Sequence, residues 1–117
     1  MKLGWCVPYL HGFIHVPTFE LWINNNRNHG INNIIIYGHW FDIPIHLNEY
    51  LDKKNIIKRN YTKILPNISF HRGISYNQPY QQWAIQDCFT FTRTKMYDWV
   101  FFGDTDEFIT LFSPVYE

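Results

Sequence analysis

The chain has 117 residues, of which 46% are hydrophobic and 20% aromatic. This length allows one domain with a single core, and this composition excludes a disordered chain. Lys and Arg together number 10, as do Asp and Glu, so the formal net charge is zero. Without an excess of positive charge, we expect neither nucleic acid nor an anionic membrane as a partner.

The N-terminal residues, MKLGWCVPYL, form a short apolar run that Pro8 interrupts. The run is too short for a signal peptide or a membrane-spanning helix, so we expect no membrane segment and, by default, a cytoplasmic location. Residues 3–10 read better as a first β-strand. Cys6 and Cys88 could form one bridge, but their spacing has no framework pattern, and we expect two reduced, buried thiols.

A first helix is predicted over residues 18–30, with Pro17 suited to its start and Gly30 to its end. Its expected buried face has helical spacing and comprises Phe19, Trp22, Ile23 and Asn26. Residues 31–38 (INNIIIYG) then form a continuous β-branched run, which is typical of a strand buried on both faces.

A second helix is predicted over residues 42–55, with Asp42 as its N-cap. Its apolar stripe consists of Ile43, Leu47, Tyr50 and Leu51. Residues 56–59 and, less clearly, 68–71 are candidate strands.

A third helix is predicted over residues 78–98, and a last strand over residues 99–104 (WVFFGD). One face of this helix carries Tyr80, Trp83, Ala84, Asp87, Cys88 and Phe91. The alternation of strands and helices predicts an α/β fold, in which a mainly parallel, Rossmann-like sheet has flanking helices. Ligands of such sheets bind beyond the C-terminal ends of the strands.

Three carboxylates, Asp104, Asp106 and Glu107, lie at and just after the end of the predicted last strand. In an extended segment, Asp104 and Asp106 would project together while Glu107 points elsewhere. Two carboxylates at a strand end suit Mn²⁺ or Mg²⁺, which would neutralise a departing diphosphate. Gly103 would let a ligand approach the backbone. Alternatively, the acids cap a turn or pair with Lys or Arg.

Asp87 lies on the apolar stripe of the third helix. It is either a residue at the helix edge that reaches water or a site residue that orients a loop or ligand near the same edge of the sheet.

In order along residues 16–112, the motifs resemble glycosyltransferase family 92. They are a Phe-x-x-Trp helix ending in Gly, a hydrophobic strand ending in Tyr, a Tyr-x-x-x-Gly-like turn, a Gln-containing helix with an Asp-Cys pair, and a strand ending in Asp-x-Asp-Glu-Phe. The matching residues are Phe19, Trp22, Gly30, Tyr37, Tyr50, Gln82, Asp87, Cys88, Trp99, Asp104, Asp106, Glu107 and Phe108. Departures from the family pattern occur at Asn55 and Gly103.

The resemblance implies a GT-A fold and transfer of a hexose from a nucleotide sugar, often UDP-linked, to a glycan or other hydroxyl acceptor. Asp104 and Asp106 would hold the metal against the donor diphosphate. Asp87 and Glu107 would be neighbouring site residues, and Asp42 would contact the nucleoside.

The family's acceptor-binding half, which generally supplies the base, would follow Phe108. We therefore expect residues 1–117 to form a single partial GT-A domain, the nucleotide-sugar-binding half, and a partner chain could complete the fold. A non-catalytic remnant or binding module is the alternative. A phosphotransfer enzyme of the haloacid dehalogenase type fits less well, because its motif places Thr or Val where Phe108 stands and lies near the start of its domain.

Overall fold

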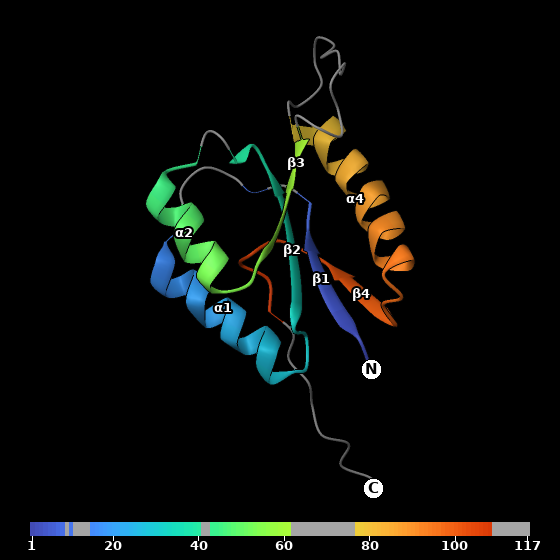
Figure 1. Ribbon diagram of the computed structural model, residues 1–117, viewed down its shortest axis with the longest axis horizontal. Coiled ribbons are helices and arrows are strands. Elements are labelled where there is room, and N and C mark those ends of the chain that lie inside the picture. Colours follow the sequence, from blue (N-terminus) through green and yellow to red (C-terminus); the bar gives the residue numbers. More distant parts are fainter. Residues whose placement is uncertain (9, 11–14, 41–42, 62–76, 109–117) are drawn as a thin grey trace, which may run out of the picture.

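The computed structural model describes residues 1–8, 10, 15–40, 43–61 and 77–108. Strands and helices alternate along this part of the chain, as the sequence predicts (Figure 1). The elements are β1 (Leu3–Val7), α1 (Val16–Asn28), β2 (Asn33–Gly38), α2 (Ile45–Lys53), β3 (Ile57–Asn60), α4 (Asn77–Thr94) and β4 (Trp99–Phe102).

The four strands form one sheet in the order β3-β2-β1-β4, and each neighbouring pair is parallel. Helices α1 and α2 lie on one side of this sheet and α4 lies on the other (Figure 1). The prediction of an α/β fold with a parallel, Rossmann-like sheet and flanking helices is confirmed. β1 is a central strand, so its C-terminal end lies beside those of β2 and β4.

Side chains along β1 and β2 alternate between the two faces, which gives the molecule two cores. On the side of α1 and α2, the buried cluster includes Trp5, Val7, Phe19, Trp22, Ile23, Ile34, Ile36 and Leu51. On the side of α4, it comprises Cys6, Ile35, Tyr37, Tyr61, Ala84 and Cys88. Strand β2 is buried on both faces, as its continuous apolar run predicts.

The predicted face of α1 is the one that is buried, including Asn26. Pro17 lies in its first turn, and Gly30, with a φ of +83°, follows its end. The stripe of α2 is also confirmed, because Leu47 and Leu51 are buried and Ile43 and Tyr50 pack against the core cluster that contains Leu51. However, α2 begins at Ile45 with Pro44 as its N-cap residue. Asp42 and the candidate strand 68–71 lie outside the described residues.

Other predicted elements also differ from the structure in detail, and β1 ends at Val7 rather than at Leu10. In α4, Ala84 and Cys88 are buried, but Trp83 is 46% exposed and lies outside the buried stripe. The last strand ends at Phe102 rather than at Asp104, because the chain turns after Gly103. No helix in the described part of the chain is both long and apolar enough to cross a membrane.

Cys6 and Cys88 are buried and joined by a disulfide, so the expectation of two reduced thiols is wrong. The physical reason is the alternation along β1, which directs Cys6 toward α4, where Cys88 lies on the buried stripe. The disulfide connects a central strand to the helix that covers it.

Candidate functional site

The acidic residues lie in a turn that begins directly after β4. The Gly103 backbone N–H donates to the Cys6 carbonyl (3.2 Å), which keeps the chain beside β1. The Glu107 N–H then donates to the Asp104 carbonyl (3.2 Å), and the Asp104 N–H donates to Glu107 Oε1 (2.9 Å). Residues 104–107 therefore form a closed turn at the C-terminal end of the sheet.

This turn corrects the expectation that Glu107 points away from Asp104 and Asp106. That expectation assumed an extended chain, whereas the turn brings one oxygen from each of the three carboxylates within 4.8 Å of the others. Glu107 also caps the turn by accepting the Asp104 N–H, so one of the structural roles considered for the acids is present. The three side chains are exposed at the surface.

The spacing of the carboxylates fits a single hard cation. Ligands of Mg²⁺ lie at about 2.1 Å, so two ligands on opposite sides of the ion are about 4.2 Å apart. Oxygens within 4.8 Å of one another need only small side-chain rotations to reach this geometry. Carboxylate oxygens suit Mg²⁺ and Mn²⁺, and the exposed side of the turn leaves space for water or phosphate oxygens as further ligands.

Two buried tryptophans hold the ends of the turn. Trp5 Nε1, from β1, donates to the Gly103 carbonyl at 3.0 Å. Trp22 Nε1, from α1, donates to the Glu107 carbonyl at 2.9 Å. The two rings meet edge to face, with centroids 5.7 Å apart. The segment after β4 accordingly passes to the side of the sheet where α1 and α2 lie (Figure 1).

Sequence reasoning placed Trp22 in the core and Trp5 in a strand, and assigned neither of them to the site. The signal that could have found them is the indole N–H, because a buried Trp usually needs a hydrogen-bond acceptor. The acceptors are backbone carbonyls of the acidic segment, which residue types alone do not reveal.

Gly103 makes room for one of these indoles. A Cβ at this position would lie 2.8 Å from Trp5 Cζ2, which is closer than real Cβ contacts allow. Trp5 is also stacked on Phe101, with ring centroids 5.9 Å apart. We expected Gly103 to let a ligand approach the backbone. In the structure, the group that approaches the Gly103 backbone is the Trp5 side chain.

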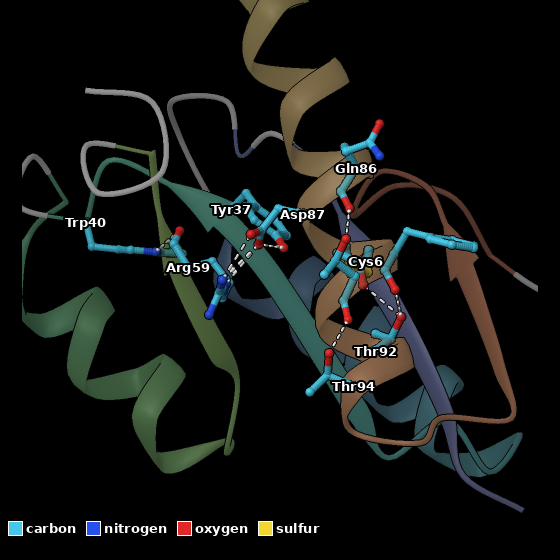
Figure 2. A network of polar contacts seen from close by, with 11 residues as sticks. Cys6, Tyr37, Trp40, Arg59, Gln86, Asp87, Thr92 and Thr94 are labelled. Atoms are coloured by element: carbon cyan, nitrogen blue, oxygen red, sulfur yellow. Dashed lines mark hydrogen bonds and ion pairs between the residues drawn. A yellow bond between two sulfur atoms is a disulfide. The ribbon is translucent and has the colours of Figure 1, made fainter. Parts of the chain in front are cut away.

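Asp87 lies on the other face of the sheet, in contact with β2 and β3. Its carboxylate accepts hydrogen bonds from the Tyr37 hydroxyl and from Nε and Nη2 of Arg59, both at 3.1 Å (Figure 2). Only 17% of its side chain is exposed. Asp87 is therefore mostly shielded from water, and it does not join the carboxylates of the turn, whose end is bonded to Trp22 of α1 on the other side of the sheet.

The environment of Tyr37 keeps its hydroxyl protonated. Burial, followed by the hydrogen bond to Asp87, raises the pKa of the Tyr37 hydroxyl far above its ordinary value. Tyr37 therefore remains a neutral donor to the carboxylate.

The Arg59 guanidinium also lies over the Phe91 ring, 4.9 Å from its centroid. Arg59, which the sequence reasoning did not single out, thus links β3 to α4.

Comparisons with known proteins assign no family to the chain. No protein-family model, curated protein or solved structure matches it. A function must therefore be inferred from the Asp104–Glu107 turn and from the motifs of the sequence.

Proposed function

We propose that the chain is a metal-dependent glycosyltransferase, or the donor-binding portion of one, which binds a UDP-linked hexose through Mn²⁺ or Mg²⁺ at Asp104 and Asp106. The observation that carries this proposal is the convergence of three carboxylates directly after a strand of a parallel sheet. That edge of the sheet is where α/β proteins generally bind their ligands. The ordered motifs that resemble glycosyltransferase family 92 also support the proposal.

In this proposal, the residues of the turn have different roles in binding the donor. Asp104 and Asp106 would supply carboxylate oxygens to the cation, and Glu107 would provide a third oxygen while it caps the turn. A bound cation supplies Lewis-acid neutralisation of the charge that develops on the departing diphosphate. The acceptor would be a glycan or another hydroxyl compound, and we assign no base to its hydroxyl among the described residues.

Isothermal calorimetry with a UDP-hexose, in the presence and absence of Mn²⁺, tests this proposal. We expect binding that requires the metal and that weakens at least about ten-fold in Asp104→Asn and in Asp106→Asn, because each variant removes a ligand charge. Asp52→Asn is the matched control, since Asp52 is an exposed carboxylate of α2 that pairs with Lys58.

Binding without metal, or equal binding by the wild type and both turn variants, would contradict the proposal. A sugar-transfer assay on the same samples separates an enzyme from a binding module, because only an enzyme releases UDP as it consumes the acceptor.

A further inference from the structure

We infer that Trp5 and Trp22 are positioning residues of the proposed metal site and hold the Asp104–Glu107 turn in the shape that directs its carboxylates to one cation. This inference rests on the proposed function and extends it to the core of the molecule. Neither indole is bonded to a carboxylate. Each donates to a backbone carbonyl, at Gly103 just before the turn and at Glu107 at its end.

The turn needs such support because its three carboxylates repel one another. Their oxygens lie within 4.8 Å, and like charges at this distance favour an open segment. Two hydrogen bonds between Asp104 and Glu107 oppose this repulsion within the turn. The indole bonds fix both ends of the turn to β1 and α1, so the charges remain together before a cation arrives.

The two tryptophans are suited to this role because they are rigidly held. Trp22 is fully buried and Trp5 is 4% exposed. Trp5 packs between the Trp22 and Phe101 rings, and Gly103 leaves the space that its indole occupies. A turn anchored in this way would need less ordering when a metal binds, which is the general benefit of preorganisation.

The chain offers a matched control for the indole bonds. Trp40 Nε1 donates to the Arg59 carbonyl at 2.7 Å, which is the same kind of bond to a strand backbone. That bond lies at β3, the edge strand at the opposite end of the sheet from β4. Replacing each Trp by Phe keeps an aromatic ring and removes the donor. Trp40→Phe therefore reports the general effect of losing an indole bond.

The test measures Mn²⁺ affinity, by calorimetry or by electron paramagnetic resonance, in the wild type, Trp5→Phe, Trp22→Phe and Trp40→Phe. We expect Trp5→Phe and Trp22→Phe to bind Mn²⁺ about five-fold more weakly, the factor that corresponds to one lost hydrogen bond. Trp40→Phe should bind Mn²⁺ as the wild type does, although its thermal stability also falls.

A second measurement needs no variant to fold. In the ¹⁵N-labelled wild type, substoichiometric Mn²⁺ should broaden the indole N–H resonances of Trp5 and Trp22 before that of Trp40, because paramagnetic broadening falls steeply with distance. The inference is wrong if the Trp5, Trp22 and Trp40 resonances broaden equally, or if all three Phe variants bind Mn²⁺ with equal affinity. Either result leaves the proposed metal site unaffected. A wild type that binds no Mn²⁺ overturns the inference and the proposed function together. Mn²⁺ binding with the expected Trp effects but without UDP-hexose binding overturns the proposed function alone.

Discussion

Asp87 lies at the centre of a polar network that ties α4 to two strands. It receives hydrogen bonds from Tyr37 of β2 and from Arg59 of β3, and it is mostly shielded from water. The sequence placed Asp87 on the apolar stripe of its helix, because it lies four residues after Trp83 and three after Ala84. The sequence did not identify its partners, because they lie 28 and 50 residues away and come together only when the sheet forms.

We predict that Asp87→Asn lowers the free energy of unfolding by about 1.5 to 2 kcal/mol, because the partly buried Arg59 guanidinium loses its counter-charge and the Tyr37 hydroxyl loses a charged acceptor. Asp52→Asn breaks the more exposed pair with Lys58 and should cost no more than about 1 kcal/mol. Urea denaturation of both variants measures the difference. Equal losses would show that the Asp87 network contributes no more than a surface ion pair.

Stability should also fall at alkaline pH. Burial and Asp87 raise the pKa of Tyr37 in the folded chain, whereas the unfolded chain titrates near the ordinary value of about 10. Above that pH the folded state binds more protons than the unfolded state, so stability is complete below about pH 10 and declines as the pH rises further. Thermal melts across this range should show a shallower decline in Tyr37→Phe. A residual decline is expected from Tyr97, whose pKa is also raised by burial. Identical declines in the wild type and in Tyr37→Phe would contradict this role of Tyr37.

Helix α1 and the turn after β4 differ in how far the sequence could predict them. The buried face of α1 follows from the spacing of its apolar residues and of Asn26, and the structure confirms it. The turn could not be predicted from spacing, because an Asp-x-Asp-Glu run is compatible with either an extended or a turned backbone. Its shape depends on the Trp5 and Trp22 indoles, which lie 98 and 85 residues from the carbonyls that they bond.

Gly103→Ala tests the contact between the turn and β1. The added Cβ would meet Trp5 Cζ2, and Trp5 cannot easily move because the Trp22 and Phe101 rings lie against it. We therefore expect the free energy of unfolding to fall by about 1 to 3 kcal/mol and Mn²⁺ binding to weaken. Gly38→Ala is the control, because a Cβ there would make ordinary contacts at 3.6 Å or more. Chemical denaturation and Mn²⁺ titration give both quantities. A Gly103→Ala variant as stable as Gly38→Ala would refute the tight contact.

At the level of the whole molecule, the alternation of strands and helices was enough to predict a parallel sheet with helices on its faces. The prediction succeeded because β2 reads as a strand buried on both faces, and such a strand needs cover on each side. The Cys6–Cys88 disulfide could not be predicted, because it depends on which face of the sheet α4 covers. The two faces of the sheet also explain why Asp87 lies apart from the acidic turn. Asp87 lies on the face that α4 covers, whereas the turn is bonded to Trp22 of α1 on the opposite face.

The disulfide closes a long loop, with 82 positions separating its cysteines, and should stabilise the fold by restricting the unfolded chain. We expect a reducing agent to lower the unfolding free energy of the wild type by about 3 to 4 kcal/mol. The doubly substituted Cys6→Ala, Cys88→Ala chain should melt at the same temperature with and without reductant. A wild-type melt that does not respond to reductant would show that the bridge makes no contribution.

The central claim is that the Asp104–Glu107 turn binds a divalent cation together with a nucleotide sugar. The most direct measurement is anomalous X-ray scattering from crystals of the chain grown with Mn²⁺ and a UDP-hexose. We predict one manganese peak within bonding distance of the Asp104 and Asp106 carboxylates, with the diphosphate on its exposed side. Two outcomes would contradict the claim. In one, the UDP-hexose is bound and the manganese peak lies away from this turn; in the other, the UDP-hexose is bound and no manganese peak appears.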